Sequence, residues 1–399
     1  MSKVLVINAG SSSIKYQLIE MPYEIKISSG LIEKINERGT NLTLHYNGNK
    51  ICIEKPLSNH QEAFHFLIEM LIKNNIIGDL NDIAACGHRI AHGGEFFKNS
   101  VEITKDNFEE IKKIEYLAPL HNPANLQGYI EMKQLLNNAI QVAVFDTSFH
   151  QSMSKEVYTY PIPFKLYEKY GLRKYGFHGT SYRNVVNRVR EMVGKEKQSR
   201  IIACHLGNGA SIAAIKNGKS INTSMGLTPL GGLMMGTRSG DLDPSIVEFI
   251  AHKECLSVED VLKQLNKESG ILGVSQISND IRDVRKAAMD GDNLSKLALE
   301  MYAQRIASFI GSYYVQLGGL DTLVFTAGVG ENDYRMRESI IDKVKDALQI
   351  ELDDEVNCSV MATDAIISSK SSKVMVLVVV ADEEIVIARD CYDILKSKL

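Results

Sequence analysis

The stretch RIIACHLGNGASIAAIKNGKSINTS, residues 200–224, predicts two strands joined by a glycine turn. The run IIACHL favours a strand, and the segment GNG that follows is a turn that no ordinary side chain would suit. ASIAAIK is then expected to be a second strand, which ends at a hairpin signal formed by Asn217 and Gly218. Backbone N–H groups that point into such a glycine turn form a concave array of donors, which suits a phosphate.

The N-terminus contains a second copy of this pattern. VLVINAGSSSIKYQLIE, residues 4–20, again predicts strand, small polar turn and strand, with Asn8 and Gly10 in the place of Asn208 and its flanking glycines. Many-unit repeat proteins have much shorter periods than the distance between these copies. We therefore predict a duplicated domain, whose two lobes face each other across a cleft.

Length and composition indicate a soluble protein of about two domains. The chain has 399 residues, of which 44% are hydrophobic and 24% charged, and its formal net charge is −4. This charge predicts neither a nucleic-acid nor a membrane partner. The six cysteines are scattered without metal-binding spacing, and the chain starts directly in a strand, so we expect reduced thiols and a cytoplasmic location.

Strand-like and helix-like segments alternate along the whole chain, which predicts an α/β fold. We expect an N-terminal lobe over 1–149 and a C-terminal lobe over 150–384, with the last helix, 385–399, packing back on the first lobe. A third glycine turn, FTAGVGEN at 325–332, opens a helix whose free N–H groups favour an anion or a nucleotide. The glycine-rich loop 225–245 is long enough to indicate a functional role.

Two arginines are the best candidates for binding a small anion. Arg89 in HRIAHGG and Arg238 in MGTRSGDLDP both lie beside glycines on predicted loops, and a pair of such arginines favours bidentate anion recognition. The chain has no GxxxxGKS stretch and no GxGxxG that opens a first helix, so neither a P-loop nor a dinucleotide-binding fold is predicted.

Oxygen ligands for a hard cation are also available. Asn8, Asp146, Asp280, Asp382 and Glu383 could serve Mg²⁺, which takes one or two carboxylates together with water and phosphate oxygens. The histidines are spread over loops without metal-binding spacing. Taken singly, each candidate also fits a structural role, such as a turn cap for Asp146 or a favourable helix N-terminal charge for Glu383.

With these motifs identified, the chain resembles the acetate kinase family over essentially its whole length. The matching stretches are NAGSSSIKY, HRIAHGGE, PLHNPAN, FDTSFH, YGFHGTS, HLGNGASI, GLTPLGGLMMGTRSGDLDP, FTAGVGEN and EEIVIARD. The resemblance implies reversible ATP-dependent phosphorylation of acetate to acetyl phosphate. It also implies the duplicated α/β fold of actin-like and sugar-kinase-like ATPases, with two lobes around a nucleotide cleft, and a homodimer.

The resemblance also implies roles for individual residues. Asp146, His178 and Arg238 would be catalytic, Arg89 and His121 would bind the substrate, and Asn8 and Glu383 would bind Mg²⁺, with Mn²⁺ as a substitute. The residues implied to bind ATP are Lys15, His205, Leu206, Gly207, Asn208, Gly209, Asp280, Ile281, Arg282, Gly328, Val329, Gly330, Glu331 and Asn332.

Three stretches depart from the family pattern. Ala91 replaces the larger valine of many members and could widen the pocket for the substrate methyl group, so propionate or another short-chain acid is an alternative substrate. Ala327 stands where glycine is common, and ADEE replaces a usual Thr-Asn before the two glutamates. A non-enzymatic alternative is an actin-like filament subunit or a chaperone-like ATPase, neither of which needs Arg89.

A carboxylate substrate changes what catalysis requires. Its pKa of about 4 leaves it ionised at neutral pH, so it needs no general base. The difficulty is instead that one anion must approach another, and Arg89, Arg238, His178, Lys15 and Mg²⁺ would screen the repulsion. We therefore expect Asp146 to orient an arginine or a Mg²⁺-bound water, rather than to remove a proton.

Overall fold

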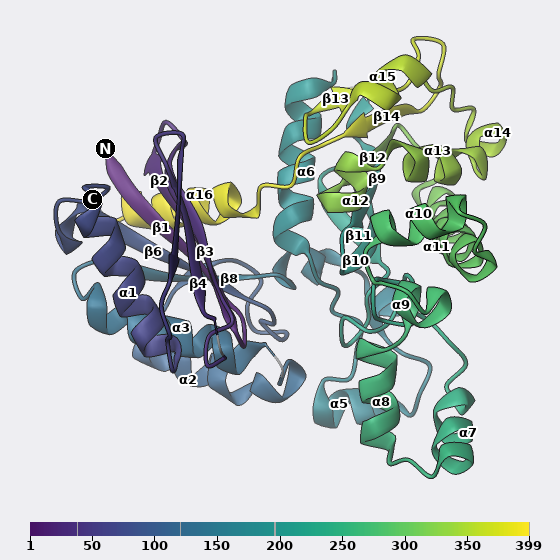
Figure 1. Ribbon diagram of the computed structural model, residues 1–399. Coiled ribbons are helices and arrows are strands. Elements are labelled where there is room, and N and C mark those ends of the chain that lie inside the picture. Colours follow the sequence, from purple (N-terminus) through teal and green to yellow (C-terminus); the bar gives the residue numbers. More distant parts are fainter. Residues whose placement is uncertain (38, 120, 195–196, 399) are drawn as a thin grey trace. The chain divides into compact units, whose positions relative to one another are not determined.

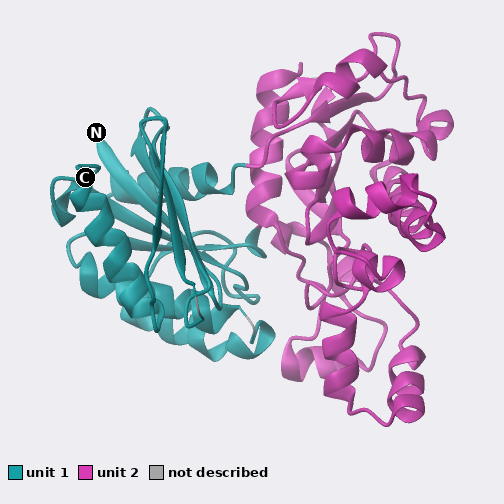
Figure 2. Ribbon diagram, in the orientation of Figure 1, with its two compact units in different colours: residues 1–148, 382–399 teal, residues 149–381 magenta. Residues whose placement is uncertain are grey.

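The computed structural model describes residues 1–37, 39–119, 121–194 and 197–398. They form two compact units (Figure 2): unit 1 contains residues 1–148 and 382–399, and unit 2 contains residues 149–381. The sequence placed these boundaries after residues 149 and 384. The difference arises because the last helix, α16 (Glu383–Lys396), packs along its whole length in unit 1.

Unit 1 is built on one mixed sheet. Its strands are β1 (Ser2–Ala9), β2 (Ser13–Met21), β3 (Ile25–Glu33), β4 (Asn41–Tyr46), β5 (Asn49–Glu54), β6 (Ile83–Ile90), β7 (Val101–Glu102) and β8 (Ile140–Phe145), in the order β5-β4-β3-β2-β1-β6-β8-β7. Strands β1 to β5 are joined as antiparallel neighbours, whereas β1, β6 and β8 run parallel.

Unit 2 contains the second sheet. Its strands are β9 (Arg200–Leu206), β10 (Ala210–Lys216), β11 (Lys219–Thr223), β12 (Thr322–Thr326), β13 (Ala365–Ile366) and β14 (Met375–Val378), in the order β11-β10-β9-β12-β14-β13. Strands β9, β10 and β11 pair antiparallel, whereas β9, β12 and β14 run parallel. The apolar run VMVLVVVA at 374–381 favours a longer strand, but β14 covers only part of it.

The two sheets share one topology, which confirms the predicted duplication. The run β3-β2-β1-β6-β8 in unit 1 and the run β11-β10-β9-β12-β14 in unit 2 have the same order and the same strand directions. The predicted hairpin at Asn217–Gly218 is present, and a second Asn-Gly hairpin lies at Asn47–Gly48. All four residues have the positive φ that such turns favour. The α/β fold class is therefore confirmed.

Helices cover both faces of the unit 1 sheet (Figure 1). Alternation along β1 sends Leu5 and Ile7 into a core with α1 (His60–Lys73) and α3 (Asn122–Leu135), whereas Val4 and Val6 pack with α16. Gly87 on β6 allows α16 to approach closely, because a Cβ there would lie 2.5 Å from Ile387 Cγ2.

Unit 2 repeats this three-layer arrangement. Ile201 and Ala203 of β9 pack on the same side as α6 (Gly179–Met192), whereas Ile202 and Cys204 belong to a larger core that includes α11 (Asn293–Leu317). The long helix α11 ends at Gly318, which has the left-handed conformation typical of a helix C-terminus.

The other α-helices complete the two units. They are α2 (Lys105–Lys113), α4 (Lys155–Tyr158), α5 (Phe164–Tyr170), α7 (Ser245–Glu254), α8 (Val258–Lys267), α9 (Gly270–Ser275), α10 (Ile281–Met289), α12 (Ala327–Asn332), α13 (Tyr334–Asp342), α14 (Lys345–Leu348) and α15 (Asp354–Ser359). In the part of the chain that the structure describes, no helix is long and apolar enough to cross a membrane.

Candidate active site

In unit 1, the parallel strands bring Arg89 and Asp146 together. Arg89 is the penultimate residue of β6, and Asp146 directly follows β8, its neighbour in the sheet. Arg89 Nε and Nη2 donate to the two carboxylate oxygens of Asp146, at 3.1 and 2.5 Å. Among the described residues, Arg89 Nη1 has no hydrogen-bond partner. Asp146 therefore fixes the plane of the guanidinium, and the Nη1 group keeps its N–H donors for another partner.

Further charges surround this pair. Glu383 Oε2 lies 3.5 Å from Arg89 Nε. Burial opposes the charge of Arg89, but Asp146 and Glu383 outweigh that effect and raise its pKa. Burial also raises the pKa of Glu383 to about 6, and repulsion from Asp146 and Glu384 acts in the same direction. Attraction to Arg89 lowers this pKa, but not enough to offset these effects. The site thus holds more carboxylate charge than its cations neutralise.

This excess negative charge fits a divalent cation. No group of three or more His, Cys, Asp or Glu side chains within residues 1–37, 39–119, 121–194 and 197–398 forms a site that could hold a metal by itself. Mg²⁺ does not need such a cage, since it is usually held by one or two carboxylates with waters and substrate phosphates. Glu383 and the neighbouring Asp146 offer carboxylate oxygens of this kind.

The other predicted residues of unit 1 are placed by β2 and α3. Asn8 and Lys15 lie opposite each other in the β1–β2 ladder. Lys15 Nζ lies 2.5 Å from Glu384 Oε1, which brings the first turn of α16 beside β2. His121 is exposed and precedes the first residue of α3, and its backbone N–H donates to the carbonyl of Ala118.

Two asparagines of the PLHNPAN stretch were not predicted as site residues, yet they hold the loop after Arg89. The Asn125 side chain accepts from the N–H of Ala91 at 3.0 Å and donates to the carbonyl of Ala9 at 2.7 Å. The Asn122 side chain bonds both the N–H and the carbonyl of His92, each at 3.0 Å. They therefore tie the ends of β1 and β6 together. In the stretch NPAN, the two asparagines are spaced so that they lie on one helix face, and this spacing could have identified them from the sequence.

In unit 2, His178 and Arg238 converge on the turn after β9. A Cβ built on Gly209 would lie 3.4 Å from Arg238 Nη1 and 3.8 Å from His178 Nε2. Among the described residues, Arg238 has no ion-pair partner, and burial lowers its pKa. A half-buried cation without a carboxylate is stabilised by a bound anion. The ring of His178 stacks on that of His205, with centroids 4.1 Å apart.

The glycine turn itself differs from the prediction. Gly207 and Gly209 do not have the positive φ that would exclude ordinary side chains. Space is the constraint instead, because a Cβ on Gly207 would lie 3.2 Å from the carbonyl oxygen of Gly209. The N–H of Gly207 donates to that carbonyl at 3.1 Å, and the N–H of Gly10 likewise donates to Ser13 at 2.8 Å. These two donors are therefore used within their turns.

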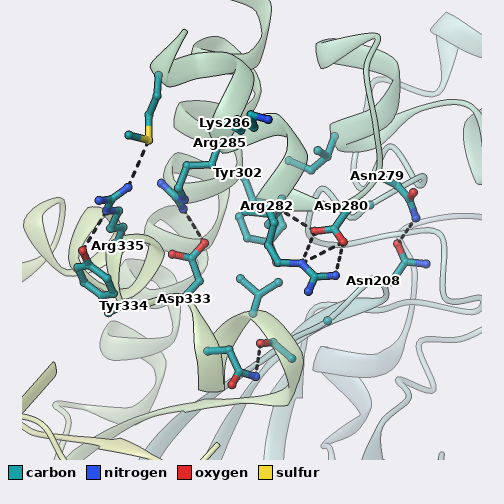
Figure 3. Close-up of a pocket in the computed structure, with 18 of the residues that line it drawn as sticks. Asn208, Asn279, Asp280, Arg282, Arg285, Lys286, Tyr302, Asp333, Tyr334 and Arg335 are labelled. Carbon is teal, nitrogen blue, oxygen red and sulfur yellow. Dashed lines mark hydrogen bonds and ion pairs between the residues drawn. The ribbon is translucent and has the colours of Figure 1, made fainter. Parts of the chain in front are cut away.

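A cavity of about 950 Å³ lies beside this turn in unit 2 (Figure 3). Eight of the predicted ATP-binding residues line it: Gly207, Asn208, Asp280, Ile281, Arg282, Gly328, Val329 and Asn332. They come from the turn after β9, from the start of α10 and from α12, which are far apart in the sequence. The structure therefore brings the three predicted nucleotide segments together.

The other predicted ATP-binding residues lie outside this cavity. Lys15 belongs to unit 1, and Leu206 is fully buried in the core of unit 2. Glu331 is also buried, and its carboxylate accepts from the N–H of Ala381 at 2.9 Å. His205 and Gly209 are instead part of the cluster around Arg238, and Gly330 packs against Phe325.

Several lining residues were not predicted. Figure 3 shows Arg285 paired with Asp333, at 2.6 Å, and Asn279 donating to Asn208, at 3.0 Å. The buried Tyr302 hydroxyl has no hydrogen-bond partner in the described part of the chain, although Tyr302 lines the cavity. In the sequence, Arg285 and Asn279 flank the predicted segment 280–282. This proximity could have identified them as candidate lining residues.

A fully buried arginine supports the third glycine turn. Arg337 on α13 donates from Nη1 to the carbonyls of Gly330 and Glu331, each at 3.0 Å, and from Nε to Asn357 Oδ1 at 2.8 Å. From Nη2 it donates to the carbonyls of Asn357 and Val360. These bonds fix the end of α12, whose other residues line the cavity. An arginine inside an apolar helical pattern was the sequence signal.

Replacing this arginine should weaken nucleotide binding selectively. We expect Arg337→Met to lower the free energy of unfolding by about 3 kcal/mol, because buried carbonyls lose their donors. The KM for ATP should rise about tenfold and the KM for the second substrate should change less. Lys345→Met, an exposed cation, is the control and should change neither. Equal increases in both KM values would contradict a specific role at α12.

Ala327, which stands where glycine is common in the family, has a strained backbone conformation. It begins α12 with a φ of 65°, in the left-handed region that favours glycine. An L-residue in this conformation is destabilised by about 1–2 kcal/mol, since its Cβ crowds the backbone.

Ala327→Gly should therefore stabilise the protein. We expect a gain of about 1 kcal/mol in the free energy of unfolding, measured by urea titration with intrinsic fluorescence. Ala287→Gly in the interior of α10 is the matched control and should lose about 1 kcal/mol, because glycine is a poor helix former. A loss of stability in both variants would show that Ala327 is not strained.

Comparisons with known proteins agree with these features. Residues 3–389 match the model of the Acetokinase family. The acetate kinase of Thermoanaerobacterium thermosaccharolyticum is 49% identical over 399 residues, 99% of each chain, and that of Staphylococcus carnosus is 47% identical over 388 residues, 97% of each. The structure of Porphyromonas gingivalis acetate kinase is 45% identical, with a TM-score of 0.94, over 99% of this chain and 100% of that one.

The protein is therefore a phosphotransferase of the kinase class, built on the duplicated α/β ATPase fold. Within that class, the chain belongs to the acetokinase family. The predicted family and the prediction of an enzyme are both confirmed, in preference to a filament subunit or a chaperone-like ATPase. A propionate kinase structure from Francisella tularensis is also similar, with 41% identity and a TM-score of 0.92, over 98% of this chain and 99% of that one.

Proposed function

We propose that this protein transfers the γ-phosphoryl group of ATP reversibly to acetate, forming acetyl phosphate and ADP. The observation that carries the proposal is the geometry of Arg89. Its guanidinium is held in plane by Asp146 and keeps the Nη1 donors for another carboxylate. A planar arginine of this kind suits a small carboxylate better than a hydroxyl substrate.

The nucleotide would occupy the cavity of unit 2. Its three converging segments and about 950 Å³ of space support this assignment. Arg238 and His178 would then contact the transferring phosphoryl group, because both converge beside Gly209, next to the lining residues Gly207 and Asn208. The reaction requires this group to meet the carboxylate bound at Arg89.

Glu383 and Asn8 would hold Mg²⁺, or Mn²⁺ in its place. When bound, the cation would neutralise phosphate charge that otherwise repels the incoming carboxylate. Arg89 orients the nucleophile, which is already ionised and needs no base. Arg238 and His178 stabilise charge on the phosphoryl oxygens as the bond to the leaving ADP breaks.

The proposal is tested by ADP release, measured in a coupled assay with Mg²⁺ and a series of short carboxylic acids. We expect ADP formation to depend on the acid, with Arg89→Ala lowering kcat/KM for acetate about 1,000-fold, because Asp146 would then repel the substrate. Arg389→Ala removes another arginine of unit 1, paired with Glu24, and should leave activity unchanged. Acid-independent ADP release would overturn the proposal.

The bidentate pair with Arg89 supports an orienting role for Asp146. We expect Asp146→Asn to lower kcat about 100-fold, since an amide holds the guanidinium less firmly. No new pH dependence should arise over the range in which acetate is ionised, because no proton is removed from it. A variant whose rate recovers simply as the pH is raised would instead indicate that Asp146 acts as a base.

Propionate remains the alternative substrate. Ala91 follows Arg89 by two residues, and its backbone N–H donates to Asn125. We propose that its small side chain borders the carboxylate site. One methylene is worth only about 1–3 kcal/mol of discrimination, so a methyl-sized change in the pocket can alter the preference. Comparison of kcat/KM for acetate, propionate and butyrate decides between these substrates. We further propose a homodimer, as the family resemblance implies, and a cytoplasmic location, as the scattered cysteines indicate.

A further inference from the structure

A buried chain of hydrogen bonds lies behind His178. Ser211 Oγ lies 2.9 Å from His178 Nδ1, and the Tyr182 hydroxyl lies 2.5 Å from the same serine oxygen. Ser211 is on β10 and Tyr182 is in the first turns of α6, the helix that His178 precedes, and neither side chain is exposed. The hydrogen-bonded chain therefore connects the core of unit 2 to Nδ1, at one edge of the imidazole ring.

The hydrogens in this chain can be placed by counting donors and acceptors. Within the described part of the protein, the Tyr182 hydroxyl bonds only to Ser211, and Ser211 Oγ bonds only to Tyr182 and His178. If Ser211 donated to Tyr182, the tyrosine hydrogen would be buried without an acceptor, which is unfavourable. All hydrogens are used only when Tyr182 donates to Ser211 and Ser211 donates to Nδ1.

This direction of donation decides the tautomer of His178. A neutral imidazole that accepts at Nδ1 carries its proton on Nε2. Nε2 lies on the side of Gly209 and Arg238, at 3.8 Å from the Cβ position of Gly209, where Arg238 Nη1 is at 3.4 Å. The protonated nitrogen of His178, Nε2, is thus the one that lies on the side of Arg238.

We propose that Tyr182 and Ser211 are positioning residues that hold His178 in the Nε2–H tautomer, so that it donates to an oxygen of the transferring phosphoryl group. The inference rests on the proposed function, which gives His178 this contact. Two further features support the fixed geometry. His178 has a φ of 59°, and its ring stacks on His205 at an interplanar angle of 23°, which opposes a ring flip. Burial raises the pKa of Tyr182, so its phenol stays a donor.

The tautomer can be observed directly by NMR in the whole protein labelled with ¹⁵N-histidine, which contains ten histidines. At mildly alkaline pH, we expect the Nε2 of His178 to show the protonated type and Nδ1 the unprotonated type. The signals are assigned by their loss in His178→Gln. A wild-type spectrum with the proton on Nδ1 would overturn the inference, even if neither Tyr182→Phe nor Ser211→Ala folds, and this measurement does not depend on catalysis.

Kinetics of the supporting variants give the second test. Tyr182→Phe and Ser211→Ala should each produce mixed tautomers and lower kcat about tenfold, with both KM values changed less than about twofold. Tyr313→Phe removes another buried hydroxyl, which has no partner among the described residues, and should keep full kcat. Ser181→Ala removes the 2.8 Å bond to His205 Nδ1 and should leave the His178 signals unchanged.

These results separate the inference from the proposed function. Wild-type kcat and an unchanged spectrum in Tyr182→Phe would refute the positioning role, even in an active kinase. An Nε2–H tautomer in a protein that lacks acid-dependent ADP release would instead refute the proposed function and leave the hydrogen-bonded chain intact.

Discussion

Parallel strand pairing is the constraint on which the site depends. In each unit, three neighbouring strands run in the same direction, so their carboxyl ends share one edge of the sheet. The register pairs Arg89 with Val144 and Ile90 with Phe145, which brings Asp146 beside the arginine. Because side chains alternate along a strand, a shift of one residue would send Arg89 to the opposite face and separate the pair.

The two units distribute charge in opposite ways. In unit 1, the carboxylates of Asp146 and Glu383 surround Arg89 and fix its position. Burial, together with repulsion from Asp146 and Glu384, raises the pKa of Glu383. In unit 2, Arg238 is half-buried and has no ion-pair partner among the described residues. Under the proposed function, the first arrangement would orient a cation and hold a metal, whereas the second would leave positive charge for a phosphate. An enzyme that joins two anions needs both arrangements.

Local sequence signals predicted most of the fold but only part of the site. Hairpins such as the one at Asn217–Gly218 depend on adjacent residues, so they could be recognised directly. The support for the site depends on contacts between distant segments. Arg337 reaches carbonyls about twenty residues away, Asn125 bridges two strand ends, and Tyr302 reads as a core residue of α11. Local spacing could have marked Asn125 and Arg337 as unusual, but the partner that each residue binds is set by tertiary packing.

The return of the chain to unit 1 at residue 382 has a consequence for biosynthesis. One face of the first sheet is covered by α16, which is made after all of unit 2, and Glu383 arrives with it. A ribosome therefore completes unit 2 before the first sheet receives its covering helix. Val4, Val6 and their neighbours stay without this cover until α16 has been made, so the first lobe to emerge matures after the second has been synthesised.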